Sequence, residues 1–431
     1  MATYEVFGLG PAISRAFALN EKGQTAGVSW DSISDSPDPV NLWEWATIWN
    51  RLSGGTRLEP PPPGVTSRAE GINDGGSVVG SFCPTQGDSR TWRRHGFVSH
   101  KGSMTDLRPI LGTEYSAAFD INNAGKVVGE AGLYLGTAED PGQLSVPFVY
   151  DVEAGSPPLF PLGKPPGHDG IQRAMSINNH GAVVGVGGTP ERGFLYTGDS
   201  LMGDSLIYLD NSDVSEISDS GLIAGAILQG AHWVAAVYDT NDSQPKFEPI
   251  GHLPGHTYST ARSINDKGEV VGISQVSLGN TMSRGFLYQD GVMTDLNDLI
   301  PAGSGWVLDT GLAINNAGEI AAWGSYNGQS RSCLLVPSDV FRVTRENNSL
   351  IWYVLRGLLD DTPGVVYPPG GPPIPVDPDW RRLDPNKLDV LSGLAVNQMA
   401  SLIKDPDVRR HVEEAGIRVM EESVRKLREG S

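Results

Sequence analysis

Cysteine is almost absent from this chain of 431 residues, which contains only Cys83 and Cys333. The two lie far apart and belong to no CxxC pattern, so a disulfide scaffold is excluded. Long hydrophobic runs are absent as well, because no stretch approaches the roughly 18 apolar residues that span a bilayer. We therefore expect no membrane span. The first ten residues lack the basic and apolar regions of a signal peptide, which favours a cytoplasmic location.

Basic residues are scarce. Lys and Arg number 32 against 51 Asp and Glu, and the formal net charge is −19. Residues 380–431 contain ten basic and nine acidic residues, so the rest of the chain carries about −20. Because nucleic acids and anionic lipids bind through cations, this balance predicts no nucleic-acid partner. The simplest interpretation of the charge is a well-solvated acidic surface.

Known catalytic motifs are also missing. The sequence has no GxSxG, HExxH, GxxxxGK[ST] or EF-hand pattern, so it indicates no catalytic residue and no cofactor. His252 and His256 are four residues apart, but they lie in a Pro-Gly connector, which favours a loop pair over a metal site. The segment 122–125 offers oxygen ligands without the spaced carboxylates that Ca²⁺ requires, so we predict a turn there and no metal.

One phrase, in contrast, occurs seven times. Its fullest form is residues 261–272, Ala-Arg-Ser-Ile-Asn-Asp-Lys-Gly-Glu-Val-Val-Gly. We call the Asn of this phrase the anchor, and a glycine follows it three residues later in every copy. A second glycine comes seven residues after the anchor in all copies except the last, which has Ala322. The anchors are Asn20, Asn73, Asn122, Asn178, Ser218, Asn265 and Asn315.

The phrase predicts a β-hairpin. Asn, Asp and Gly tolerate the positive φ that a tight hairpin turn needs. Adjacent Val residues after the turn indicate a strand buried on both faces, and the final Gly permits a bend or a close backbone approach. A third strand follows, as in residues 193–196 and 285–288, and then a turn and a fourth. Four antiparallel strands repeated seven times predict an all-β, seven-bladed β-propeller over residues 1–342.

The ends of the repeat region predict how the ring closes. The last repeat has three clear strands that end near Val336, and residues 4–9 have the pattern of a missing fourth strand. We therefore expect residues 4–9 to form the outer strand of the last blade.

The repeat resembles the HAF-repeat family over residues 1 to about 340. The resemblance rests on the Ala-x-x-Ile-Asn-x-x-Gly-x-Val-Val-Gly phrase, the Gly-Phe-Leu-Tyr phrase and connectors such as residues 253–255. It implies a repeat fold, common in bacterial proteins described as extracellular, and it implies no shared catalytic residues. An extracellular location is therefore the alternative to the cytoplasmic one.

The sequence changes character after about Val343. Residues 343–379 contain an apolar segment and a Pro/Gly-rich stretch, which predicts a stiff linker. Residues 380–431 predict two amphipathic helices that begin at Asp384-Pro385 and Asp405-Pro406. Such a tail buries too little surface to fold alone, so we expect it to mediate self-association, docking or binding of a protein partner.

Equivalent positions in a propeller form rings, and one such ring is rich in basic residues. The position before the third-strand phrase is occupied by Trp45, His95, Val146, Arg192, Val234, Arg284 and Arg331. We predict a ligand-binding rim at His95, Arg192, Arg284 and Arg331, with Trp43 and Trp45 as aromatic contacts. The alternative is that each cation pairs with a nearby carboxylate. Arg262 stands out separately, because its counterparts are Phe, Glu or Met.

These features favour a non-catalytic scaffold that recognises a protein or a small anionic or carbohydrate ligand through its loops. The alternative is a propeller enzyme, a hydrolase or lyase, with its site in the central channel. A lectin-like carbohydrate binder is a third hypothesis. The propeller fold does not decide between them.

Overall fold

The computed structural model describes residues 4–10, 13–30, 44–50, 54–59, 66–84, 94–134, 143–155, 172–187, 192–197, 206–209, 211–277, 283–338, 365–366 and 374–375. The chain divides into two units, Met1–Pro337 and Ser338–Ser431. In the second unit, β28 (Val365–Val366) pairs with β29 (Ile374–Pro375). The predicted helices over 380–431 lie outside the described residues and stay predictions, as does most of the predicted linker.

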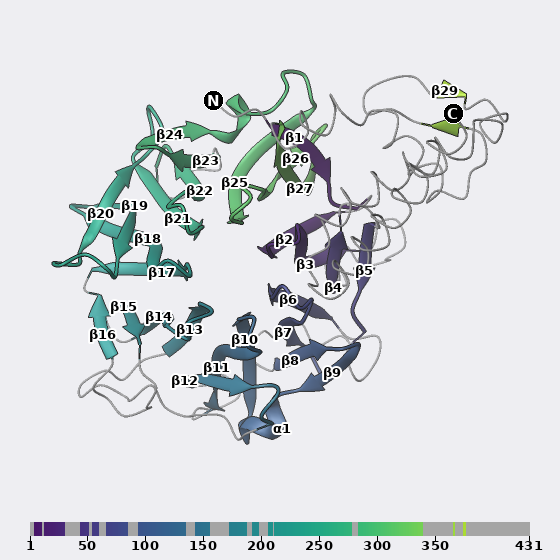
Figure 1. Ribbon diagram of the computed structural model, residues 1–431, viewed down its shortest axis with the longest axis vertical. Helices are drawn as coiled ribbons and strands as arrows, with labels where there is room; N and C mark the ends of the chain where they lie inside the picture. Colours follow the sequence, from purple (N-terminus) through teal and green to yellow (C-terminus); the bar gives the residue numbers. More distant parts are fainter. Residues whose placement is uncertain are drawn as a thin grey trace, which may run out of the picture. The chain divides into compact units, whose positions relative to one another are not determined.

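The first unit is a ring of seven antiparallel sheets, as the repeat predicted (Figure 1). Blade 1 contains β2 (Ser14–Leu19), β3 (Gln24–Trp30), β4 (Glu44–Asn50) and β5 (Gly54–Arg57). Blade 2 contains β6 (Ser67–Ile72), β7 (Val78–Phe82), β8 (His95–His100) and β9 (Ser103–Asp106). Blade 3 has three described strands, β10 (Tyr115–Ile121), β11 (Lys126–Tyr134) and β12 (Gln143–Asp151), and the short helix α1 (Arg108–Leu111) precedes it.

The other four blades have four strands each. Blade 4 contains β13 (Gln172–Ile177), β14 (Val183–Gly187), β15 (Arg192–Tyr196) and β16 (Leu206–Leu209). Blade 5 contains β17 (Ser212–Ile217), β18 (Leu222–Gln229), β19 (His232–Asp239) and β20 (Phe247–Gly251). Blade 6 contains β21 (Tyr258–Ile264), β22 (Val270–Gln275), β23 (Ser283–Gln289) and β24 (Val292–Asp295). Blade 7 contains β25 (Trp306–Ile314), β26 (Ile320–Tyr326), β27 (Gln329–Pro337) and β1 (Tyr4–Gly8), and the 3₁₀ turn η3 (Leu296–Asp298) precedes it.

The N-terminal strand β1 closes the ring, as predicted. It pairs antiparallel with β27, from Tyr4 opposite Pro337 to Gly8 opposite Cys333. Tyr4 is only 4% exposed and belongs to the apolar cluster that blade 7 shares with blade 6. The last blade is therefore built from two segments more than 300 residues apart in the sequence.

The second strand of each blade explains the Val-Val-Gly pattern. In β7 and β14 every side chain is buried, because both faces of the strand pack against neighbouring blades. A Cβ added at Gly80 would lie 1.9 Å from the carbonyl oxygen of Arg68, so the inner strand passes too close for any side chain. Blade 7 has an extra bulge in β25, which moves the close approach to Gly324 and leaves room for Ala322.

The inner hairpins turn through glycines with positive φ. The glycine three residues after each anchor has φ between 70° and 84°, a conformation that other residues adopt only at a cost. The seven are Gly23, Gly76, Gly125, Gly181, Gly221, Gly268 and Gly318.

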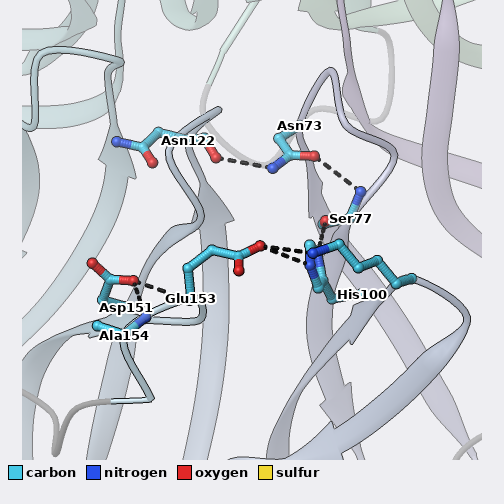
Figure 2. Close-up of polar contacts among 8 residues, drawn as sticks. Asn73, Ser77, His100, Asn122, Asp151, Glu153 and Ala154 are labelled. Atoms are coloured by element: carbon cyan, nitrogen blue, oxygen red, sulfur yellow. Dashed lines mark hydrogen bonds and ion pairs between the residues drawn. The ribbon is translucent and has the colours of Figure 1, made fainter. Parts of the chain in front are cut away.

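The anchor asparagines hold these turns and also join the blades. Asn122 Oδ1 accepts a hydrogen bond from the backbone N–H of Lys126, within its own turn, at 2.9 Å. Asn122 Nδ2 donates to the carbonyl of Asn178, the anchor of the next blade, at 3.0 Å. Figure 2 shows the equivalent contact from Asn73 to Asn122. We call this series the amide ring; its donors are Asn20, Asn73, Asn122, Asn178, Asn265 and Asn315, the last of which donates to Asn20.

The amide ring has one gap, between blades 5 and 6. Ser218 accepts from Asn178 Nδ2 but has no amide with which to reach Asn265. Its hydroxyl lies 2.9 Å from that of Ser220 instead. Six of the seven blade boundaries therefore have this contact, and the boundary after blade 5 does not.

A second set of contacts joins the blades at the opposite ends of the inner strands. Ser67, six residues before its anchor, accepts from the backbone N–H of Ala46 in the preceding blade at 2.9 Å. Ser116 and Ser259 make the same contact with Gly96 and Ala235. The boundaries at Ser67 and Ser116 thus have a contact at both ends of the inner strand, whereas the boundary at Ser259, between blades 5 and 6, has the serine contact without the amide-ring contact.

Candidate functional site

The inner strands surround a central cavity of about 240 Å³. Figure 1 shows β2, β6, β10, β13, β17, β21 and β25 facing the centre of the ring. The residue three before each anchor lines the cavity, and these seven are Phe17, Glu70, Phe119, Met175, Ser215, Arg262 and Leu312. Glu70 and Arg262 are the only ionisable members of this set.

Arg262 has no ion-pair partner among the described residues. Its side chain is exposed to the cavity. Within the part of the chain that the structure describes, no carboxylate lies within ion-pair distance of its guanidinium. The sequence had singled out this position as a departure from the other copies, and the structure places it on the cavity wall.

Arg15 and Arg68 extend the positive charge beside Phe17. The Arg15 guanidinium lies 5.5 Å from the centre of the Phe17 ring, and that of Arg68 lies 5.3 Å from it. Arg15 also lies over the Trp323 ring, at 5.4 Å. Burial, followed by the neighbouring charges of Arg262 and Arg68, lowers the pKa of Arg15. This group was not predicted, although Arg occurs five residues before the anchor in three of the seven repeats.

Glu70 is the titratable group best suited to proton transfer. Burial raises its pKa to about 7, against the opposing effect of Arg68 and Arg94. Its Oε1 lies 3.7 Å from Arg68 Nε, and 21% of the side chain remains exposed. A carboxylic acid that changes protonation near neutral pH and still contacts the cavity can accept or donate a proton there.

Two further acids on the cavity wall have structural roles. Asp120 Oδ2 accepts from the backbone N–H of Ile177 at 2.9 Å, and Glu216 Oε2 accepts from that of Ile264 at 3.1 Å. Both contacts cross from one blade to the next. Burial raises the pKa of Asp120, and it raises the pKa of Glu216 to about 8.

The pKa of Glu216 predicts how stability depends on pH. Between pH 4.5, its ordinary pKa, and about pH 8, the folded protein holds a proton that the unfolded chain releases, so stability falls as pH rises through this range. The Glu216→Gln variant has no proton to release, so its stability does not fall in this way, and its amide oxygen still accepts the Ile264 N–H. We expect the variant to gain about 3 kcal/mol over the wild type on going from pH 5 to pH 8.

Urea denaturation of both proteins at the two pH values measures this gain. Glu248→Gln is the control, because Glu248 is exposed on the outer strand β20 and its neutralisation leaves the buried acids unchanged. Parallel pH dependences in Glu216→Gln and the wild type would contradict the assignment.

The turn end of the cavity is acidic. The residue after each anchor accepts a backbone N–H from the preceding blade, as when Asp74 Oδ1 accepts from Glu21 at 2.9 Å and Asp266 Oδ1 accepts from Ser220 at 2.8 Å. We call this set the acidic end; it comprises Glu21, Asp74, Asn123, Asn179, Asp219, Asp266 and Asn316. Positive and negative charge are therefore concentrated at opposite ends of the inner strands.

The predicted rim residues lie on the third strands, outside the set of residues that line the cavity. His95 is buried, with Nδ1 2.8 Å from Asp106 Oδ2. Arg284 Nε lies 3.6 Å from Asp295 Oδ2, and Arg331 donates to the carbonyl of Gly10. His95 and Arg284 thus show the carboxylate pairing that was the alternative to a binding rim.

The other residues predicted to bind a ligand are Arg192, Trp45 and Trp43, and the structure shows less of their surroundings. Arg192 begins β15, and Trp45 lies in β4 with the Arg57 guanidinium 5.3 Å from its ring. Trp43 lies outside the described residues. A binding role for any of the predicted rim residues stays a prediction.

A serine–histidine–glutamate series also joins blades 2 and 3 (Figure 2). Ser77 Oγ lies 2.7 Å from His100 Nδ1, and His100 Nε2 lies 3.1 Å from Glu153 Oε1, which also contacts Lys101. Ser77 is 4% exposed and is not among the residues that line the cavity. The series therefore serves as a contact between blades, and we assign it no nucleophile.

The described residues contain no candidate metal site and no helix that could span a membrane. Among the described residues, no group of three or more His, Cys, Asp or Glu side chains is placed to hold a metal ion. His252 and His256 each contact a neighbouring oxygen through Nδ1. No described helix has the length and apolar composition needed to cross a bilayer.

Comparison with known proteins gives fold-level similarity alone. No protein-family model matches the chain, and no curated protein sequence matches it. Among solved structures, the acylaminoacyl peptidase of Pyrococcus horikoshii is 8% identical, with 67% of this chain and 52% of that chain covered and a TM-score of 0.37. A gluconolactonase from Xanthomonas campestris is 11% identical, with 78% and 89% covered and a TM-score of 0.36.

A third solved structure, from a study of two prolyl endopeptidases, is 11% identical to this chain. The match covers 79% of this chain and 48% of that chain, with a TM-score of 0.46. This chain thus spans about half the length of the peptidases that it matches. At these scores the similarities carry no argument about activity. The seven-bladed propeller itself is established by the strand pairing of this chain.

Proposed function

We propose that the protein acts on a small molecule in its central cavity, as a hydrolase or a lyase. The observation that carries the proposal is that Glu70 and Arg262 line the same cavity, one with a pKa near neutrality and the other with an unneutralised charge. The cavity volume of about 240 Å³ suits a small ligand, since sites for drug-sized molecules start at roughly 300 Å³.

Glu70 supplies the proton transfer in this proposal. As a base it removes a proton from a bound water, for hydrolysis, or from a carbon beside a carboxylate, for elimination. As an acid it returns that proton to the leaving group. Arg262 stabilises the negative charge that develops on the substrate oxygen, because a fixed cation in a partly enclosed site is worth more than one in water.

Binding without catalysis is the second candidate function. It is favoured by the ion pair between Glu70 and Arg68, which holds the carboxylate in place as a structural group would be held. The predicted scaffold role of the loops and of residues 380–431 depends on segments that lie largely outside the described residues. We keep that role, the predicted cytoplasmic location and membership of the HAF-repeat family as proposals, the last supported by the seven copies of the motif.

Replacing Glu70 by Gln tests the catalytic proposal. The wild type is assayed on a panel of esters, lactones and uronate-containing saccharides, with proton release reporting hydrolysis and absorbance of a new carbon–carbon double bond reporting elimination. On a substrate that is turned over, we expect Glu70→Gln to lower kcat by about 100-fold or more. The wild-type rate is expected to change with an apparent pKa near 7, and the variant is expected to lose this dependence.

Glu248→Gln is the matched control and should keep the wild-type kcat. Full kcat in Glu70→Gln would overturn the assignment of Glu70. Binding of a panel member in the cavity without any turnover would support the non-catalytic candidate in place of the enzyme.

A further inference from the structure

Charge is unevenly distributed around the cavity of a protein whose formal net charge is −19. Four arginines lie at or beside this cavity: Arg262 lines it, Arg15 and Arg68 contact Phe17, which also lines it, and Arg94 shares Glu44 with Arg68. Two glutamates neutralise part of this charge, since Glu44 lies 3.3 Å from Arg68 and 3.7 Å from Arg94, and Glu70 lies 3.7 Å from Arg68. Two positive charges therefore remain without a carboxylate.

The two arginines outside these ion pairs are Arg15 and Arg262, and the charge of Glu70 offsets part of that of Arg15. Both side chains are exposed, and neither has an ion-pair partner among the described residues. They lie on blades 1 and 6. Arg262 lines the cavity, and the Arg15 guanidinium lies 5.5 Å from the ring centre of Phe17, which lines the same cavity; the charge of Arg262 also lowers the pKa of Arg15. Arginines that repel each other at short range cost free energy in the empty protein, and a bound anion removes that cost.

The acidic end of the cavity indicates the direction from which an anion reaches these arginines. The acidic end has four carboxylates, from Glu21, Asp74, Asp219 and Asp266. An anion is repelled there and attracted at the arginines, so it enters the cavity from the end where the inner strands begin.

We propose that the ligand of the central cavity is a small dianion, such as a dicarboxylate or a phosphate, that binds between Arg15 and Arg262 and enters from the arginine end. This proposal rests on the proposed function, because it names the class of molecule on which the same cavity acts. Phe17 lines the same cavity as Arg262, and its ring contacts the guanidinium groups of both Arg15 and Arg68.

Calorimetric titration of the full chain tests this proposal with succinate, phthalate and inorganic phosphate as probes. We expect at least one of the three to bind, and the mono-methyl ester of a bound dicarboxylate to bind about tenfold more weakly. Arg262→Leu should weaken binding about tenfold or more, and Arg262→Lys should recover part of the loss. Leu is the residue at the equivalent position of blade 7, Leu312, so the substitution suits the fold.

Two further measurements sharpen the result. Binding by the wild type should weaken as salt concentration rises, and Arg262→Leu should show a shallower dependence. Lys246→Leu, which removes an exposed cation outside the set that lines the cavity, should bind like the wild type.

The proposal is overturned if none of the three dianions binds, or if Arg262→Leu binds as tightly as the wild type. It is also overturned if succinamide, the neutral analogue, binds as tightly as succinate. The variant Ser215→Trp, whose side chain fills the cavity from β17, distinguishes failure of the dianion proposal from failure of the proposed function. If succinamide binds and Ser215→Trp abolishes its binding, the cavity is still a small-molecule site; if no probe binds, both proposals fail.

Discussion

Deletion of residues 1–10 is expected to lower the melting temperature by several degrees. The deletion removes β1 and its pairing with β27, and it exposes the apolar surface that Tyr4 and Leu9 cover, each of which is 4% exposed. Burial of two such side chains contributes about 4 kcal/mol, and each kcal/mol shifts the melting temperature of a large domain by about 2 °C. Differential scanning calorimetry measures the change.

A proline substitution separates closure of the ring from the general loss of a strand. Val6→Pro interrupts β1 opposite Leu335, whereas Val292→Pro interrupts β24, the outer strand of blade 6. β24 pairs with the strand directly before it in the sequence, so its loss leaves the ring closed. We expect the larger drop in Val6→Pro, and equal melting temperatures in the wild type and the deletion would contradict the role of β1.

Asn122→Ala is expected to destabilise the propeller by about 3 kcal/mol. The substitution leaves the Lys126 N–H and the Asn178 carbonyl without their side-chain partner, and the anchor is buried, at 4% exposure. A buried hydrogen bond that loses one partner costs about 1–3 kcal/mol, and two are lost here. Chemical denaturation monitored by tryptophan fluorescence measures the change.

Replacing Asn122 by serine distinguishes its contact within the turn from its contact with the next blade. In blade 5, Ser218 Oγ still accepts from the Leu222 N–H at 3.1 Å, so Asn122→Ser should keep the turn and lose the link to blade 4. Conversely, Ser218→Asn should complete the amide ring and stabilise the protein by about 1 kcal/mol. If Asn122→Ser were as stable as the wild type and Ser218→Asn brought no gain, the amide ring would contribute nothing to stability.

The architecture was predictable because its determinants are local and repeated. Gly268 needs a positive φ within its own turn, and Val270 and Val271 are buried within their own strand, so each copy of the phrase carries the same information. Seven copies then fix the number of blades. The closing strand at residues 4–9 was predictable because the last repeat visibly lacked one.

The link between blades was not predictable from one copy of the phrase. Asn265 donates to a carbonyl 50 residues away, and the pattern around it shows only the turn that its Oδ1 stabilises. The choice of asparagine at the anchor was the indication of this link, because the serine at the anchor of blade 5, Ser218, is sufficient to form the turn. The serines six residues before the anchor, such as Ser67, form a second periodic pattern in the sequence that also indicates contacts between blades.

The candidate site was predictable only in part. Arg262 was noticed because it differs from its counterparts, and its position three residues before the anchor places it on the cavity wall. The charge excess beside it depends on Arg15 and Arg68, which meet around Phe17 from two blades. Whether an arginine is neutralised depends on carboxylates elsewhere in the chain, such as Asp295 beside Arg284, and the sequence does not reveal those pairs.

The pairing of β1 with β27 also sets the order in which the protein is completed during synthesis. β1 leaves the ribosome before any blade, but its partner at residues 329–337 emerges more than 300 residues later. At roughly 5–20 residues per second, this strand waits on the order of tens of seconds with an unpaired edge. Six blades can form in that time, but the ring stays open until the seventh arrives. A nascent chain stalled before residue 329 should therefore expose β1 to chaperones or to the strand edges of neighbouring chains.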